Sequence, residues 1–431
     1  MSVRQVIEAD WTWLDGRFQA GVRIAVDDAG RIAAVGPLPQ PPTRRLKDRA
    51  LLPGFVNGHS HAFQRGLRGW TENFAGGAGS FWTWREAMYA LVQRLDRERF
   101  HSLCRLAFDE MLATGVTSVA EFHYLHHDDP LTRDFALDRV LLETAAEAGV
   151  RLVLLATYYR TGGIGKPLVE LQRRFETRSL DEFRRQLDRL AAQLDRPRQT
   201  LGIAAHSIRA VPPEDLIALR REAAARGWPF HMHVEEQRQE VEECSFVLGT
   251  TPLEWLLEHV EIGPRFTAIH ATHASGDALD RFLAAGGNIC LCPITEANLG
   301  DGMADVPRML ERPEAVCIGT DSNIRIDLPE ELRWLEYGQR LRLERRGVCR
   351  GLSGDVAAQL LDCGTVNGAR ALGLDAGRIA VGLAADLFTI DLTYPALSGW
   401  TPQTLAASFL CGGDGSVVRE VCVGGRWVLG V

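Results

Sequence analysis

Three features that would mark other classes of protein are missing from this sequence. No apolar run approaches the length that spans a bilayer, and the first residues lack the apolar core of a secretory signal peptide. Basic residues are not in excess, since 48 of them face 56 acidic residues, for a net charge of −8. This balance argues against the electrostatic footprint of a nucleic-acid-binding domain and provides no membrane-binding patch. We therefore expect neither a nucleic acid nor a membrane as a partner.

Paired cysteine spacing is also missing. The nine cysteines form no zinc-finger pattern, and their odd number argues against a disulfide framework. This usage indicates reduced thiols and hence a cytoplasmic protein. Cys290 and Cys292 make one Cys-x-Cys pair on an apolar stretch, and no second pair accompanies them. For these two residues, packing in a barrel core is the stronger interpretation.

The sequences at the two ends of the chain both show a pattern of short strands and turns. Residues 23–36 follow a hairpin pattern, and strand-like runs recur near residues 385–390 and 417–425. The length of 431 residues, 46% of them hydrophobic, suits a barrel and one smaller domain. The predicted domains are a small, discontinuous β-sandwich domain built from residues 1–52 and 377–431, and a catalytic barrel of residues 53–376.

The region between these ends alternates apolar, strand-like runs with helical patterns. Helical patterns occur at residues 180–194, 213–226, 252–260 and 276–285. Repeated βα units imply a parallel sheet, and eight of them imply an α/β fold with a closed, TIM-like (β/α)8 barrel. Active sites of that fold lie at the carboxyl ends of the strands. The eight strands are expected to end near His61, His123, Tyr159, Ser207, His233, His270, Thr295 and Asp321.

Two histidines stand at the end of the first predicted barrel strand. His59 and His61 follow the apolar run of residues 50–56. Residues two apart in a strand point to the same face, so both imidazoles can hold one metal ion. The alternative is a pair of hydrogen-bonded histidines that fills the mouth of a barrel, and the pattern alone does not separate the two.

Residues of the metal-ligand type at other strand ends favour the metal interpretation. His233, His270 and Asp321 each end a predicted apolar strand. Three histidines and a carboxylate that leave one position open for water suit a catalytic zinc or ferrous ion. The competing interpretation makes Asp321 a helix N-cap and the histidines barrel filler.

A second group of histidines follows the second predicted barrel strand. His123, His126 and His127 have the composition of a metal cluster. We interpret them instead as residues that line a loop, with Tyr124 reaching the substrate.

Several motifs resemble the amidohydrolase superfamily. They are PGFVNGHSH at residues 53–61, His233, His270, TDS at 320–322 and GRIAVGLAADL at 377–387. Longer runs are similar to the formimidoylglutamate deiminase family within that superfamily, and together the matches extend along almost the whole chain. These runs are HAFQR at 61–65, SFWTWRE at 80–86, AEFHY at 120–124, HSIRAV at 206–211, TEANLGDG at 295–302 and EELRWLEYGQRL at 330–341.

The resemblance implies a site with one divalent metal ion. Zinc suits the nitrogen and oxygen ligands, and ferrous iron suits them too. Superfamily members with two metals bridge them through a carboxylated lysine. The two lysines of this chain, Lys47 and Lys166, lie away from the predicted strand ends, so a mononuclear site is expected. The ligands implied for it are His59, His61, His233 and Asp321.

The same resemblance implies hydrolysis of N-formimino-L-glutamate to N-formyl-L-glutamate and ammonia, a step of histidine breakdown. A bound metal lowers the pKa of its water to ~7 and so supplies hydroxide near neutral pH. His270 and Asp321 are expected to take the proton of the water, and Glu236 to protonate the leaving nitrogen. Glu236 is preferred to the adjacent Glu235 because it stands three residues after His233, as in the deaminase pattern.

A substrate with two carboxylates needs cations with planar donor forks, which arginine provides. Arg209 lies just past a predicted strand end, and Arg85 lies in the segment after the first barrel strand. The resemblance favours pocket roles for both, with Gln64, Tyr124 and His206 as neutral partners. The alternative is that both arginines lie on the surface.

Two other functions stay open on the sequence. A purine or pterin deaminase would use the same metal site, although a neutral ring needs no pair of cations. A non-catalytic scaffold would be expected to have lost some of the ligands, all of which are present here. We expect a small-molecule dicarboxylate as the partner, and a homodimer is compatible with the sequence.

Overall fold

A computed structural model describes residues 3–74 and 79–430, and its centre is a parallel barrel. Eight parallel strands pair in sequence order from β6 to β13. The ring closes where Ser60, at the end of β6, forms a parallel bridge with Asp321, just after β13. The strands are β6 (Phe55–Ser60), β7 (Val116–His123), β8 (Arg151–Tyr158), β9 (Gln199–Ser207), β10 (Phe230–Val234), β11 (Phe266–His270), β12 (Asn288–Leu291) and β13 (Val316–Ile318). The predicted fold class is confirmed.

Helices surround the barrel, and local sequence sets their ends. Ser179 caps α4 by accepting a hydrogen bond from the amide of Glu182. Pro213 occupies the first turn of α5, which ends at Gly227 with a positive φ of 66°. The helices are α1 (Phe81–Val92), α2 (Arg97–Ala113), α3 (Ala136–Ala148), α4 (Leu180–Gln193), α5 (Pro213–Arg226), α6 (Arg238–Leu248), α7 (Pro252–His259), α8 (Gly276–Ala284), α9 (Pro293–Leu299), α10 (Val306–Met309), α11 (Leu328–Leu343), α12 (Val356–Gly364), α13 (Val366–Leu372) and α14 (Leu405–Gly412). Short 3-10 segments are η1 (Ala62–Leu67), η2 (Glu170–Phe175), η3 (Pro313–Ala315), η4 (Pro395–Leu397) and η5 (Gly415–Val417).

One predicted strand end is wrong. The seventh barrel strand, β12, ends at Leu291, and Thr295 lies inside α9. Pro293 explains the early stop, because its fixed φ suits the first turn of a helix and it has no amide hydrogen for the sheet.

Strands from both chain ends build a second sheet. Its order is β16-β15-β14-β5-β1-β3-β4, with β2 paired to β1. The β1–β5 pair is parallel, whereas β5 and β14 pair antiparallel, so N-terminal and C-terminal strands meet in one mixed sheet. The predicted domain boundaries at residues 52 and 377 stay a prediction. The strands are β1 (Val3–Leu14), β2 (Arg17–Gln19), β3 (Arg23–Asp27), β4 (Ile32–Gly36), β5 (Arg44–Pro53), β14 (Leu387–Asp391), β15 (Val418–Val423) and β16 (Arg426–Leu429).

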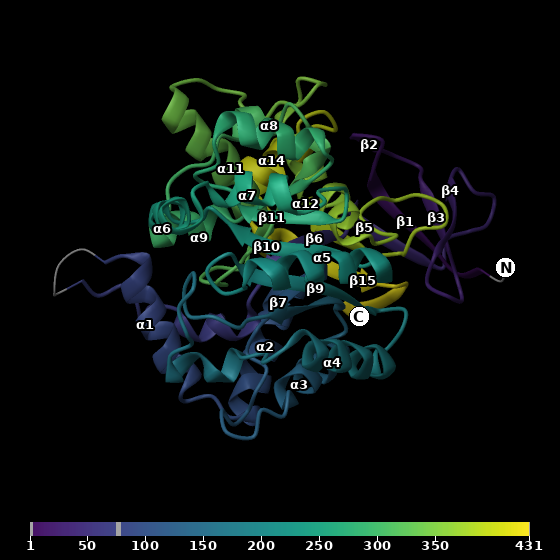
Figure 1. Ribbon diagram of the computed structural model, residues 1–431. Helices are drawn as coiled ribbons and strands as arrows, with labels where there is room; N and C mark the ends of the chain where they lie inside the picture. Colours follow the sequence, from purple (N-terminus) through teal and green to yellow (C-terminus); the bar gives the residue numbers. More distant parts are fainter. Residues whose placement is uncertain (1–2, 75–78, 431) are drawn as a thin grey trace.

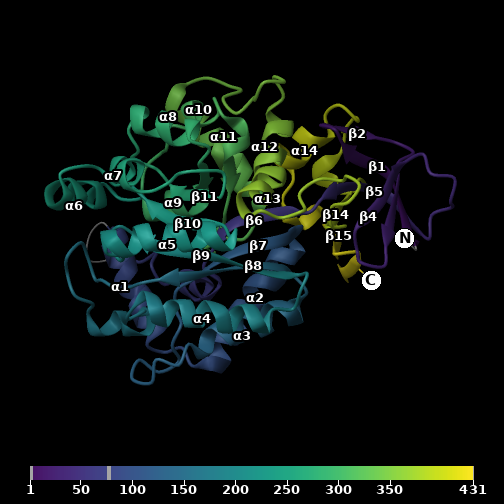
Figure 2. The same cartoon turned by 45° about the vertical axis from the view of Figure 1, so that its right-hand side comes forward.

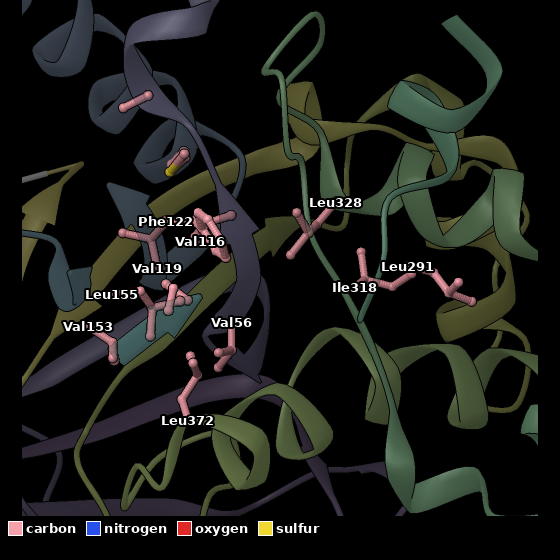
Figure 3. Close-up of a cluster of buried hydrophobic side chains, with 14 of the residues drawn as sticks. Val56, Val116, Val119, Phe122, Val153, Leu155, Leu291, Ile318, Leu328 and Leu372 are labelled. Carbon is pink, nitrogen blue, oxygen red and sulfur yellow. The ribbon is translucent and has the colours of Figure 1, made fainter. Parts of the chain in front are cut away.

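The barrel strands are apolar and buried along nearly their whole length. Parallel strands that are covered on both faces read as continuous hydrophobic runs. Figure 3 shows part of the result: Val56, Val119 and Leu155 come from three adjacent strands and lie in one cluster of buried side chains. Burying a side chain of this size stabilises the fold by about 1.5–3 kcal/mol. This packing holds the strand ends in fixed positions.

The mixed sheet and the helices α1 and α6 lie at opposite ends of the molecule (Figures 1 and 2). Both chain termini lie on the side of the mixed sheet (Figure 2). Within residues 3–74 and 79–430, no helix has the length and apolar character that crossing a membrane requires.

Candidate metal centre and active site

Three histidines and one aspartate converge at the carboxyl end of the barrel. Donor atoms of His59, His61, His233 and Asp321 all lie within 4.8 Å of one another, and all four side chains are buried. Oδ1 of Asp321 lies 3.2 Å from Nε2 of His59 and 3.3 Å from Nε2 of His61. Nε2 of His233 lies 3.1 Å from Nε2 of His59. The four ligand positions predicted from the sequence are therefore brought together.

Hydrogen bonds on the far side of two rings turn their Nε2 atoms inward. Nδ1 of His61 lies 2.8 Å from the carbonyl oxygen of Phe122, and Nδ1 of His233 lies 2.8 Å from that of His206. A carbonyl oxygen only accepts, so Nδ1 carries the proton and Nε2 presents a lone pair. Two inward-facing imidazoles fixed in this way, next to a carboxylate, are what a divalent metal ion requires.

The pKa values of these groups favour the ligand forms. Burial lowers the pKa of His61 to about 3 and holds the pKa of His233 well below its ordinary value, so both rings are neutral. Burial alone would raise the pKa of Asp321, but the hydrogen bond with His59 and the neighbouring imidazoles lower it below its ordinary value. The cluster thus pairs neutral imidazoles with an ionised carboxylate.

The backbone at the end of β13 is tied to the end of β6. The amide of Asp321 donates to the carbonyl of His59 at 3.0 Å, and the amide of His61 donates to the carbonyl of Asp321 at 2.8 Å. Gly319 allows this approach, because a Cβ there would lie 2.7 Å from the carbonyl oxygen of His59. Asp321 has φ 43°, a left-handed conformation that is rare outside glycine and typical of functional sites.

The predicted acid–base residues stand beside this cluster. Nε2 of His270 lies 3.8 Å from Oδ2 of Asp321 and 3.9 Å from Oε1 of Glu236. Burial raises the pKa of Glu236 to about 7, against the lowering effect of His270 and Arg209. A carboxyl group with a pKa near neutral pH can both give and take a proton there.

The two adjacent glutamates point to different surroundings. Glu236 lines the cavity over the metal cluster. Glu235, at φ 51°, turns its Oε1 towards α7, where it accepts the amide of Leu253 at 2.8 Å. The position predicted for the proton carrier therefore faces the site, and its neighbour serves the start of a helix.

A cavity opens above the cluster. Amide and phenol groups are already linked in its wall, since Nε2 of Gln64 donates to the hydroxyl of Tyr124 at 2.7 Å. Helix α1 supplies much of one side. The lining residues are His61, Gln64, Phe81, Trp84, Arg85, Met88, Tyr89, Tyr124, Tyr159, Phe175, His206, Arg209, His233, Glu236, Leu299 and Asp321. All five predicted substrate-binding residues are among them.

The two arginines enter the cavity in different ways. Arg209 is buried, and its Nε donates to Oε2 of Glu240 at 3.0 Å. Its terminal nitrogen lies 3.8 Å from Oε2 of Glu236. The Arg85 guanidinium lies over the ring of Trp82, 4.3 Å from its centroid. Neither side chain is a freely solvated surface arginine, which was the alternative.

Two further carboxylates, Glu240 and Glu296, support the site, and the sequence did not indicate a role for either. Glu240 is fully buried and binds Arg209, while its Oε1 accepts the amide of Glu235 at 3.1 Å. Oε1 of Glu296 lies 3.2 Å from Nδ1 of His270. Each stands in the first turn of a helix that follows an active-site strand, α6 and α9. That position is a usable signal, although acidic residues are common in first helical turns for electrostatic reasons alone.

His123 and His126 of the second histidine group form a hydrogen-bonded network with Asp138. Oδ1 of Asp138 lies 3.0 Å from Nε2 of His123 and 2.8 Å from Nδ1 of His126. The other nitrogen of His126 lies 2.7 Å from the carbonyl oxygen of Thr157. Tyr124, between these histidines in sequence, lines the cavity. The residues His123 and His126 therefore pack away from the site.

Comparisons with known proteins agree with this geometry. A model of the amidohydrolase family matches residues 50–428. A formimidoylglutamate deiminase from Pseudomonas aeruginosa is 39% identical over 417 residues, which cover 95% of this chain and 91% of that protein. An amidohydrolase structure from Brucella melitensis has a TM-score of 0.87 at 32% identity, covering 98% of this chain and 94% of that one. An adenosine deaminase from Xanthomonas campestris, solved with bound zinc, has a TM-score of 0.81 at 24% identity, covering 98% and 92%. The resemblance seen in the motifs is confirmed: the chain belongs to the amidohydrolase family.

Proposed function

We propose that this protein hydrolyses N-formimino-L-glutamate to N-formyl-L-glutamate and ammonia. The observation that carries the proposal is the presence of Arg85 and Arg209 in one cavity with the metal cluster and Glu236. The relative that is 39% identical along 95% of the chain is a formimidoylglutamate deiminase, which supports the same substrate. We infer a cytoplasmic enzyme of histidine breakdown.

One zinc ion held by His59, His61, His233 and Asp321 is the proposed cofactor. The donor set of nitrogen and oxygen atoms fits zinc, and the described part of the chain places no lysine at this cluster that could bridge a second ion. Lys166 instead pairs with Glu243 near the surface, and Lys47 is exposed. When bound, the ion would supply hydroxide near neutral pH by lowering the pKa of water to about 7.

The chain's own residues carry the protons. Oδ2 of Asp321 accepts the proton that the attacking water gives up, and Nε2 of His270, 3.8 Å away, orients that water. Glu296 holds Nδ1 of His270, so Nε2 is the nitrogen directed to the reacting atoms. Glu236, 3.9 Å beyond, delivers a proton to the substrate nitrogen, so that ammonia leaves instead of an amide anion.

The two substrate carboxylates bind the arginines. Glu240 occupies Nε of Arg209 and leaves the outer edge of that guanidinium for a carboxylate. Arg85, stacked on Trp82, offers a second donor fork. Burial and the positive arginine nearby keep the pKa of His206 well below its ordinary value, so it acts as a neutral partner. Gln64 and Tyr124 supply further polar groups in the same wall.

Ammonia release measured side by side with formiminoglutamate, guanine, cytosine and adenosine tests this function. We expect turnover of formiminoglutamate to exceed that of the neutral rings. A protein that prefers a purine would contradict the proposal and favour the purine or pterin deaminase.

Charge recognition is tested separately with substrate esters. Arg209→Met and Arg85→Met should each cost a few kcal/mol in kcat/KM, roughly 2–5 kcal/mol for the loss of a buried charge partner. Esterifying the substrate carboxylates should harm the wild type far more than either variant, while the zinc content stays the same. Equal sensitivity of wild type and variants to the ester would remove the arginines from substrate binding.

A further inference from the structure

A buried thiol stands at the edge of the metal cluster. Cys292 follows β12, and its sulfur lies within 4.8 Å of donor atoms of His270 and Asp321. All three side chains are buried. Cys292 also belongs to a small cluster of buried residues that contains Cys290 and Cys317. The core packing expected for the Cys-x-Cys pair is therefore only part of its environment.

His270 has one ring nitrogen available to a ligand. Its Nδ1 is held by Glu296 at 3.2 Å. Its Nε2 is buried and has no hydrogen-bond partner among the described residues. A carboxylate on the far nitrogen is the usual support of a histidine that binds a metal, because it fixes the ring and makes the free nitrogen more basic. Glu296 also accepts the amide of Cys292 at 2.9 Å, so one carboxylate orients both candidate ligands.

We propose that His270, Cys292 and Asp321 form a second, weaker site for a thiophilic divalent cation such as Zn²⁺. Sulfur favours zinc over magnesium or calcium, which prefer oxygen ligands. The thiol would bind as thiolate, so each ion bound releases the thiol proton to solvent. The site would be weaker than the first because Asp321 is shared and because two cations at short range repel each other.

Occupation of this site would inhibit the reaction. The ion would take Nε2 of His270, which orients the attacking water in the proposed mechanism, and the second oxygen of Asp321, which accepts its proton. The cation site itself depends only on the geometry of the three residues, whereas its inhibitory effect rests on the proposed function.

Cobalt provides a readout that does not depend on substrate. The protein is first loaded with one equivalent of zinc, and Co²⁺ is then added. We expect a near-ultraviolet thiolate-to-cobalt charge-transfer band, because Cys292 supplies a sulfur ligand that the first site lacks. The band should be absent in Cys292→Ser and present in Cys290→Ser, a matched control two residues earlier, in β12, and in the same buried cluster.

Inhibition by excess Zn²⁺ gives the second readout. Each variant is compared with its own activity at one equivalent of zinc. The Zn²⁺ concentration that halves activity should rise by about tenfold or more in Cys292→Ser, the scale on which a lost ligand contact weakens metal binding, and should be unchanged in Cys290→Ser. The proposal is overturned if no band appears, if Cys290→Ser loses it equally, or if zinc inhibits Cys292→Ser as it does the wild type. A band without turnover of formiminoglutamate would instead count against the proposed function alone.

Discussion

Two buried clusters of histidine and aspartate differ in the direction in which their ring nitrogens point. In the first, His59, His61, His233 and Asp321, ring nitrogens face one another: Nε2 of His233 lies 3.1 Å from Nε2 of His59. In the second, built on His126 and Asp138, ring nitrogens face protein acceptors. Composition and burial are alike, so the direction of the lone pairs is what separates a metal site from a structural network.

The charge state of His126 follows from its contacts. Both of its nitrogens lie within hydrogen-bonding distance of atoms that can accept, Oδ1 of Asp138 and the carbonyl oxygen of Thr157. Both nitrogens must therefore donate, and the ring is an imidazolium. Burial opposes this charge, but Asp138 raises the pKa of His126 above its ordinary value. The second cluster carries a positive charge on His126, whereas His61 and His233 of the first cluster are neutral and can act as metal ligands.

Metal removal should separate the two clusters most strongly. Exhaustive chelation should abolish activity, because the first cluster holds the proposed catalytic zinc, and one equivalent of zinc should restore it. Elemental analysis before and after treatment gives the count of ions per chain. Two tightly held equivalents, or activity that survives chelation, would contradict a mononuclear catalytic site.

The next largest effect is expected at the proton carrier. Glu236→Gln keeps the shape of the side chain and removes its proton, which should lower kcat by roughly two to four orders of magnitude. The metal content should remain near that of the wild type. Glu235→Gln is the matched control, since Glu235 binds the amide of Leu253 outside the cavity. A larger loss in the control than in Glu236→Gln would reverse the assignment.

Breaking the second cluster should damage stability and spare the metal. Asp138→Asn leaves the buried imidazolium of His126 without its counter-ion, which should reduce the free energy of unfolding by about 3–5 kcal/mol, measured by urea denaturation. Asp109→Asn, which breaks the exposed pair with Arg105, is a control expected to cost less than about 1 kcal/mol. Loss of zinc from Asp138→Asn with normal stability would show that the second cluster is a metal site.

The ion pair of Asp138 and His126 also predicts how the free energy of unfolding depends on pH. The neighbouring histidines lower the pKa of Asp138 against the effect of burial, so its contribution to stability is present above its unfolded pKa of about 4 and is lost at lower pH. His126 has a raised pKa, so its contribution is complete below an unfolded pKa of about 6.5 and is lost as the pH rises through the folded value. The gap in unfolding free energy between wild type and Asp138→Asn should therefore be widest between about pH 4 and 6.5.

The smallest effect is expected at the support of Arg209. Glu240→Gln keeps one acceptor for Nε of Arg209 and removes the buried charge opposite it. We expect KM to rise about tenfold, which corresponds to roughly 1.4 kcal/mol of binding free energy, with a smaller change in kcat. Glu240→Asp should recover part of the loss if charge and not length is what matters. An unchanged KM would show that Arg209 is held in place without Glu240.

Much of the barrel and the metal cluster could be predicted from the sequence. His59, His61, His233 and Asp321 end apolar strands, and strand ends of a parallel barrel must meet at one rim. Helices such as α5 begin and end where proline and glycine are placed. These features depend on periodicity and on local turn chemistry, which sequence carries directly.

Other parts depend on contacts between distant segments. The spacing of His123 and His126 does not show that both rings hydrogen-bond to Asp138, or that His126 also contacts the carbonyl oxygen of Thr157. The partners Glu240 and Glu296 look like ordinary acidic residues of a first helical turn. The stop of β12 is a different case, because Pro293, which follows the end of the strand, is visible in the sequence, and the prediction carried the strand past it.

The contact between the end of β6 and the segment after β13, which closes the barrel, has a consequence for synthesis of the chain. His59 and His61 are made early, and the residue that hydrogen-bonds to both of their backbones, Asp321, is made more than half a chain later. A growing chain that stops before β13 possesses the histidine ligands without their carboxylate and without the strand that closes the ring. The complete ligand set and the closed ring therefore arise together, once the segment with β13 and Asp321 is in place.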